Sequence, residues 1–247
     1  MPVARMHGGL RSALDQEPRP SGKGQRHGTN MANLKIAPRK TGYARGQELY
    51  EKILQSAFEI LVDEGLDALS FGSIAKSLNT KPANINYYFP SKEALIADLL
   101  GAIMTSYQHQ IESICAQCNV NTEERFKSIV EMIVFDLASK ETTRVFPELW
   151  ARANRDSFFQ KRLDEIYEFG RRTLTDLIAE MRPDLSSKHC ELIGYHAQAA
   201  LEGLTIFAGH NKPLQPKIRM VANIAKSMLL EGVLNISAED IVARSKK

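Results

Sequence analysis

The chain of 247 residues has few of the features that mark secreted or membrane-spanning proteins. Its three cysteines are Cys115, Cys118 and Cys190. A secreted disulfide framework would need more cysteines, in pairs, in a shorter chain. No apolar run approaches the ~18 residues of a membrane span, and residues 1–30 lack the apolar core of a signal peptide. These absences predict no membrane partner and a reducing, cytoplasmic setting.

Motifs of the common enzyme classes are also missing. The chain has no nucleophile elbow, phosphate-binding loop, paired metal-ligating histidines around a glutamate or dinucleotide-binding glycine cluster. Cys115 and Cys118 form one CxxC pair, whereas a structural zinc site needs four ligands. We therefore expect no catalytic residue, no cofactor and no metal site, and we interpret the two cysteines as ordinary buried or half-buried residues.

The net charge of +3 conceals an uneven distribution. Residues 1–47 carry nine Lys or Arg against two acidic residues, a net charge of +7, so the remainder carries −4. Positive charge gathered at one end of a chain is typical of proteins that bind nucleic acid. Residues 1–38, rich in Gly, Pro, Ser and Arg, predict a disordered basic extension, although a solvated tail is an equal interpretation for residues 1–30. Met31 is a second candidate start.

Three short helices are predicted after this extension. Apolar residues at helical spacing predict the first over 47–64, which Gly65 ends. Ser70 can cap a second helix, Asn79 suits a tight turn, and Pro82 suits the first position of a third helix. Two short helices joined in this way form a helix-turn-helix, and the second of them enters a DNA groove.

The third helix has an unusual composition. Between Thr80 and Phe89 there is no acidic residue. Asn can pair with adenine, Lys can reach guanine or a phosphate, and a Tyr hydroxyl can donate to a phosphate oxygen. The residues that supply such donors are Lys81, Asn84, Asn86, Tyr87 and Tyr88. A surface helix of an all-helical protein, rich in amides and aromatic rings, is the alternative interpretation.

The residues that follow carry a family resemblance. The order Asn86-Tyr87-Tyr88-Phe89-Pro90-Ser91-Lys92-Glu93-Ala94-Leu95, within residues 47–100, resembles the DNA-binding domain of the TetR family of transcriptional regulators. The resemblance implies that Ile85 and Phe89 point into a small core. It also implies DNA or phosphate contacts from Ser70, Phe71, Lys81, Asn84, Asn86, Tyr87, Tyr88 and Lys92, with Tyr88 alternatively bracing the helix. Arg39, Lys40 and Arg45, next to the first helix, are expected to touch a flanking phosphate or the minor groove.

Helical periodicity continues through the rest of the chain. It predicts helices over 92–118, 122–139, 142–153, 158–181, 186–208 and 216–234. The expected fold is all-α. An N-terminal three-helix helix-turn-helix DNA-binding domain over 39–92 precedes a larger C-terminal helical ligand-binding and dimerisation domain over 93–235, and 236–247 form a tail. In the family the last two long helices make a homodimer, whose two reading helices, ~34–36 Å apart, fit a near-palindromic double-stranded DNA operator.

The resemblance also implies a small-molecule effector in the second domain. Aromatic or polar residues on otherwise apolar helices are candidates to line its pocket, or belong to the core: Tyr107, Phe146, Trp150, Tyr167, Tyr195 and His196. The sequence thus predicts a sequence-specific transcriptional regulator, a homodimeric repressor that an unidentified small molecule releases from its operator. The alternative is a helical interaction module whose helix-turn-helix binds a protein partner.

Overall fold

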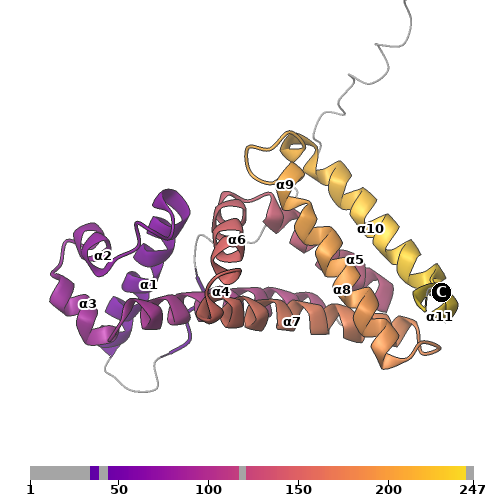
Figure 1. Cartoon of the computed structure of the whole chain (residues 1–247), viewed down its shortest axis with the longest axis horizontal. Coiled ribbons are helices and arrows are strands. Elements are labelled where there is room, and N and C mark those ends of the chain that lie inside the picture. Colours follow the sequence, from indigo (N-terminus) through magenta and orange to yellow (C-terminus); the bar gives the residue numbers. More distant parts are fainter. Residues whose placement is uncertain (1–33, 39–43, 117–120, 243–247) are drawn as a thin grey trace, which may run out of the picture.

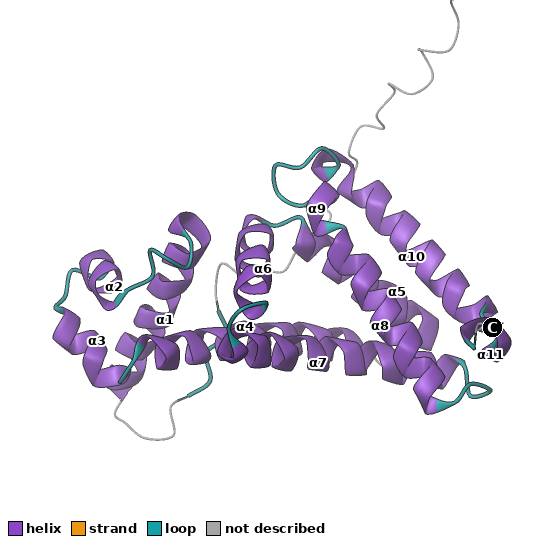
Figure 2. Ribbon diagram, in the orientation of Figure 1, coloured by secondary structure: helices purple, strands orange, loops and turns teal. Residues whose placement is uncertain are grey.

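The computed structural model describes residues 34–38, 44–116 and 121–242, in which every regular element is a helix (Figures 1 and 2). The helices are α1 Ala44–Glu64, α2 Phe71–Ser77, α3 Pro82–Tyr88, α4 Lys92–Cys115, α5 Thr122–Leu137, α6 Lys140–Ala153, α7 Ser157–Met181, α8 Ser187–Gly203, α9 Thr205–Ala208, α10 Ile218–Asn235 and α11 Ala238–Ile241, with a 3-10 turn η1 Gln215–Lys217. The all-α prediction is confirmed. Within the described ranges, no helix has the length and apolar composition needed to cross a membrane.

Helices α1 to α3 form a small unit at one end of the molecule (Figure 1). Gly65 ends α1 with φ at +89°, a conformation that glycine adopts without strain. The Ser70 side chain accepts from the backbone N–H of Ser73, and the Ser73 hydroxyl donates back to the Ser70 carbonyl, which fixes the start of α2. Asn79 makes the turn with φ at 48°, and Pro82 is the first residue of α3. The local signals predicted these positions correctly.

The long helix α4 runs from this unit into the larger helical domain, where α7 packs against it (Figure 1). The buried core of the small unit continues along α4 and reaches Val145 and Phe146 of α6. A second core, around Phe126, Leu174 and Ala197, joins α5, α7, α8 and α10. Helix α6 therefore lies between the two units.

Most predicted helix boundaries lie within three residues of the observed ones, and the clearest difference is at the end of α8. A continuous helix over 186–208 is wrong, because α8 ends at Gly203 and a separate short α9 begins at Thr205. Glycine lowers helix propensity by about 1 kcal/mol relative to alanine, which favours a break there. Helix α4 ends at Cys115 rather than near Cys118, which lies outside the described residues.

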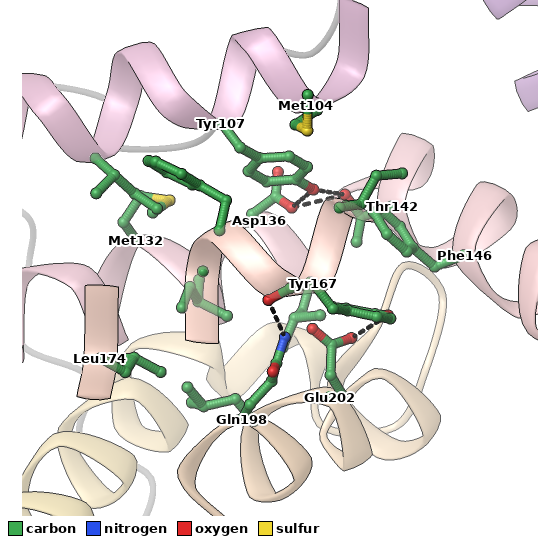
Figure 3. Close-up of a pocket in the computed structure, with 17 residues that line it drawn as sticks. Met104, Tyr107, Met132, Asp136, Thr142, Phe146, Tyr167, Leu174, Gln198 and Glu202 are labelled. Carbon is green, nitrogen blue, oxygen red and sulfur yellow. Dashed lines mark hydrogen bonds between the residues drawn. The ribbon is translucent and has the colours of Figure 1, made fainter. Parts of the chain in front are cut away.

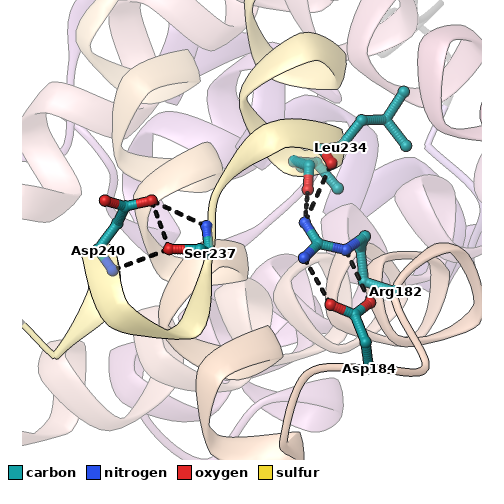
Figure 4. Close-up of polar contacts among 6 residues, drawn as sticks. Arg182, Asp184, Leu234, Ser237 and Asp240 are labelled. Atoms are coloured by element: carbon teal, nitrogen blue, oxygen red, sulfur yellow. Dashed lines mark hydrogen bonds and ion pairs between the residues drawn. The ribbon is translucent and has the colours of Figure 1, made fainter.

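Polar contacts fix the end of α10 and the start of α11 (Figure 4). The Arg182 guanidinium donates to the carbonyl oxygens of Val233 at 2.6 Å and Leu234 at 3.3 Å, and it pairs with the Asp184 carboxylate. These bonds satisfy carbonyls that the end of α10 leaves without helical partners. Ser237 and Asp240 then form a capping box that starts α11. Residues 238–241, which lie within the predicted C-terminal tail, therefore form a short helix.

The prediction that residues 1–38 are disordered is wrong for residues 34–38, which the structure describes. Leu34 is buried against the small unit, and its N–H donates to the Gln55 side chain at 3.4 Å. The Lys35 N–H donates to the Ser106 hydroxyl of α4 at 2.8 Å. Residues 1–33 lie outside the described part of the chain.

Candidate nucleic-acid interface and helical-domain cavity

Two buried side chains hold α3 against the small unit. Ile85 is fully buried, and Phe89, which follows the helix, is 1% exposed. The Phe89 ring stacks on the Tyr50 ring of α1, with centroids 5.5 Å apart. Both residues lie in the core, as the resemblance implied. The other side chains of α3 are exposed, except that of Tyr88, which is half-buried.

The outward surface of α3 carries the predicted donors. Lys81, Asn84, Asn86 and Tyr87 are all exposed, and Tyr87 is 81% exposed. The Asn84 amide donates to the Thr80 hydroxyl at 2.7 Å, which orients that side chain. A bulky aromatic ring that the described part of the chain leaves mostly in water is available to a partner.

Tyr88 occupies the bracing position. Its side chain is half-buried, its ring lies 6.4 Å from the Tyr50 ring, and the Tyr87 ring meets it edge-on at 5.2 Å. Tyr50 in turn donates to the Asp98 carboxylate of α4 at 2.8 Å. The aromatic side chains thus connect α3 to both α1 and α4.

The other described residues that were expected to contact DNA have side chains that contact the protein itself. Ser70 is exposed but its hydroxyl caps α2, and Phe71 is half-buried against the core. The Lys92 ammonium donates to the Leu66 carbonyl at 3.3 Å, so it points toward the protein. Arg39 and Lys40, and the side chain of Arg45, lie outside the described residues.

The helical domain contains a mainly apolar cavity of about 70 Å³ (Figure 3). Each of the helices α4 to α8 contributes lining side chains. They include Tyr107 from α4, Asp136 from α5, Phe146 from α6, Tyr167 from α7 and Glu202 from α8. The cavity is therefore the point where five helices of this domain meet.

One polar group of the cavity is centred on Asp136, which is 3% exposed. The Tyr107 hydroxyl donates to its carboxylate at 2.5 Å and the Thr142 hydroxyl at 2.8 Å. Burial, reinforced by the Asp136 charge, raises the pKa of Tyr107 well above its ordinary value. The phenol therefore stays protonated and remains a donor.

A second polar group surrounds Tyr167. Its hydroxyl accepts from the Trp150 indole at 2.7 Å and donates to the Glu202 carboxylate at 3.3 Å. The Gln198 amide donates to the Tyr167 backbone carbonyl at 3.5 Å. Burial raises the pKa of Glu202 to about 7; the Tyr167 hydrogen bond opposes this shift and the Asp136 charge adds to it. Glu202 can therefore change its charge near neutral pH.

The cavity contains only part of the predicted ligand-binding set. Tyr107, Phe146 and Tyr167 line it, whereas Trp150 lies behind Tyr167. Tyr195 and His196 are exposed and do not line it, so that prediction is wrong for this cavity. The buried face of α8 is formed by Ile193, Ala197 and Leu201, which turns positions 195 and 196 outward.

Four polar lining residues were missed: Asp136, Thr142, Gln198 and Glu202. A signal existed for three of them. Asp136 interrupts an apolar stretch of α5, and Gln198 and Glu202 are four residues apart on a helix of small and apolar residues, which puts them on one face.

Helix α6 connects the cavity to the small unit. Thr142 and Phe146 line the cavity, while Glu148 accepts the Leu66 N–H at 2.7 Å. Arg144 donates to the Val62 carbonyl at 3.1 Å. On the same stripe of α6, Lys140 and Arg152 pair with Asp63 and Asp67. These contacts would therefore transmit a displacement of α6 at the cavity to the end of α1.

Apolar side chains are also exposed along α8 to α10. Met220, Ile224 and Met228 are each more than half exposed and lie at four-residue spacing along α10. Further large exposed apolar residues of this region are Leu192, Tyr195, Ile206, Phe207, Leu214 and Leu234. Apolar residues gathered in this way usually mark a surface that another protein covers.

The two cysteines that the structure describes form no recognisable site. Cys115 is partly buried and Cys190 is buried, whereas Cys118 lies outside the described residues. Across the described ranges, no three His, Cys, Asp or Glu side chains are grouped closely enough to hold a metal ion.

Two family models match the chain. Residues 53–99 match the model of bacterial regulatory proteins of the tetR family, and residues 122–229 match the C-terminal model of BetI-type transcriptional repressors. Among curated relatives, the uncharacterized HTH-type transcriptional regulator YvdT of Bacillus subtilis is 32% identical over 85 residues, 34% of this chain and 41% of that protein. The match thus spans about two fifths of that relative.

Solved structures share the fold over most of the chain. A putative transcriptional regulator from Pseudomonas aeruginosa PAO1 is 15% identical with a TM-score of 0.65, covering 80% of this chain and 94% of that one. A putative transcriptional regulator from Saccharomonospora viridis, solved in complex with choline, is 18% identical with a TM-score of 0.61, covering 76% and 96%. At these identities the likeness shows the fold alone.

Proposed function

Because the chain belongs to the TetR family of transcriptional regulators, we propose that it binds operator DNA as a homodimer and that a small molecule in the cavity releases it. The observation that carries this proposal is the outward surface of α3. The exposed side chains here are those of Lys81, Asn84, Asn86 and Tyr87. The buried side chains of Ile85 and Phe89 anchor this helix in the core. Such a helix can enter a major groove without changing its own packing.

The homodimer would form through α8 and α10. The exposed apolar residues of these helices and of α9 would be buried between the two protomers. A dimer also gives DNA binding its strength, because two reading helices held at one helical turn engage both half-sites of a near-palindrome together.

The small molecule would act through α6. This helix lines the cavity with Thr142 and Phe146 and holds the end of α1 through Arg144 and Glu148. An effector that prefers a shifted α6 would favour the conformation in which the two α3 helices no longer match the operator spacing. The BetI-type match and the choline complex of the neighbour from Saccharomonospora viridis support an effector site in this domain.

The first test replaces Lys81, Asn84 and Tyr87 with Ala together. Because all three are exposed, the dimer should stay folded while specific operator binding is lost, measured by fluorescence anisotropy and analytical ultracentrifugation. The matched control is Lys161→Ala with Arg172→Ala, two exposed cations of α7. Unchanged operator affinity in the triple variant would contradict the proposal.

Salt separates DNA binding from the alternative of a protein partner. The logarithm of affinity for DNA should fall with the logarithm of salt concentration by roughly 0.9 for each phosphate neutralised. A flat salt response together with capture of a protein ligand by α3 would favour the interaction module instead.

A further inference from the structure

Four aromatic rings, those of Tyr107, Phe146, Tyr167 and Phe169, and two carboxyl groups border the cavity (Figure 3). The Tyr107 and Phe146 ring centroids are 6.2 Å apart, and those of Phe146 and Tyr167 are 6.0 Å apart. Asp136 is hydrogen-bonded to Tyr107, and Glu202 to Tyr167. Each carboxyl group therefore lies beside an aromatic side chain.

Among the described residues that line the cavity, no side chain supplies a positive charge to Glu202. None of the described lining residues is Lys, Arg or His. Glu202 belongs to none of the ion pairs found among the described residues. A carboxylate without a positive partner is unfavourable in apolar surroundings. A ligand that brings positive charge would therefore gain most from this cavity.

We propose that the cavity binds a small organic cation, a protonated amine or a quaternary ammonium ion, with the Glu202 carboxylate as its counter-charge. Aromatic faces attract such cations, so the rings of Tyr107, Phe146 and Tyr167 would surround its alkyl groups. The volume of about 70 Å³ restricts the ligand to a few heavy atoms unless the walls move apart. For comparison, an engineered cavity of ~150 Å³ binds benzene.

Cation binding should depend on pH. Burial raises the pKa of Glu202 to about 7, so the carboxyl group is neutral in acid and charged in base. The groups that face it are Tyr107 on α4, Asp136 on α5, and Tyr167 on α7. A bound cation favours the carboxylate, so its affinity should fall about ten-fold from about pH 8 to about pH 6. Tetramethylammonium is the probe for this measurement of affinity against pH, because its own charge does not change with pH.

The main experiment compares three probes of one shape and different charge: tert-butylammonium, tert-butanol and pivalate. Binding to the full chain is measured by isothermal titration and by ligand-observed NMR at about pH 8. The wild type should bind tert-butylammonium at least ten-fold more tightly than either of the others. In Glu202→Gln, which keeps the shape and removes the charge, this preference should shrink to less than about two-fold.

The matched control is Glu191→Gln, which removes one charge from an exposed position of the same helix and should keep the wild-type preference. Three outcomes overturn the proposal: equal or tighter binding of tert-butanol or pivalate, no binding of any probe, or a preference that survives in Glu202→Gln.

This inference rests on the proposed function only in treating the bound cation as the effector. Operator affinity is therefore measured in the same preparations, with and without tert-butylammonium. Cation binding without any specific DNA binding would contradict the proposed function alone. Specific DNA binding in a protein that shows no preference for the cation would contradict this inference alone.

Discussion

The α3 surface and the cavity of the helical domain both contain side chains that a purely structural helix would not place there, but in opposite ways. On α3, polar and aromatic groups are exposed although the helix is well anchored. In the cavity, carboxyl and hydroxyl groups are enclosed among apolar side chains. The α3 surface is built from one short segment, whereas the cavity requires five helices that converge. A recognition surface of the first kind can be predicted from local sequence, and one of the second kind can be predicted only in part.

The largest expected effect separates anchoring of α3 from recognition by α3, at two aromatic residues that are two positions apart. Phe89→Ala should destabilise the protein by about 3–5 kcal/mol, because it empties a buried site that stacks on Tyr50. Tyr87→Ala should change the free energy of unfolding by less than about 0.5 kcal/mol, because the ring is already in water. Urea unfolding of both variants measures the difference. Equal destabilisation would mean that Tyr87 also belongs to the core.

An effect of intermediate size on the free energy of unfolding is expected from the Glu202 carboxylate in the cavity. The pKa of Glu202 is raised above its ordinary value of 4.5 to about 7, so the folded protein binds this proton more tightly than the unfolded chain. Its contribution to stability is therefore complete below pH 4.5 and is lost as pH rises through about 7. Glu202→Gln should raise the free energy of unfolding at about pH 8 by on the order of 2–3 kcal/mol and change it little at about pH 5.

Thermal unfolding at the two pH values, with Glu191→Gln as the control, measures this effect. Destabilisation by Glu202→Gln at the higher pH would show that the carboxylate is well solvated or paired.

The smallest effect concerns the connection between the two regions. Glu148→Gln replaces the charged acceptor of the Leu66 N–H with a neutral one, which should weaken the link from α6 to the end of α1 by about 1 kcal/mol. The expected result is a several-fold smaller change in operator affinity when effector is added. Operator affinity without effector should be nearly unchanged. Glu141→Gln, in the first turn of the same helix, serves as control. An undiminished effector response would exclude Glu148 from the connection.

The small unit could be predicted from sequence because its determinants act over a few residues. Ser70 caps the helix that follows it, Asn79 takes the left-handed conformation of the turn, and Pro82 begins α3. Exposure of Lys81, Asn84 and Tyr87 followed from the same short pattern.

The cavity could be predicted only in part. Tyr107 and Glu202 are far apart in sequence and meet through the packing of α4 to α8. Residue type predicted Tyr195 of α8 as a lining residue. In the structure, helix packing leaves Tyr195 exposed and places Glu202 at the cavity. Residue type alone could not distinguish these cases.

Selection of genomic DNA fragments from the source organism tests the central claim most directly. The wild-type protein should enrich a near-palindrome whose half-sites are about one helical turn apart, because two α3 helices would read it together. The variant with Ala at positions 81, 84 and 87 should enrich nothing, although it still dimerises. Enrichment of the same fragments by that variant, or no enriched sequence with the wild type, would contradict the account.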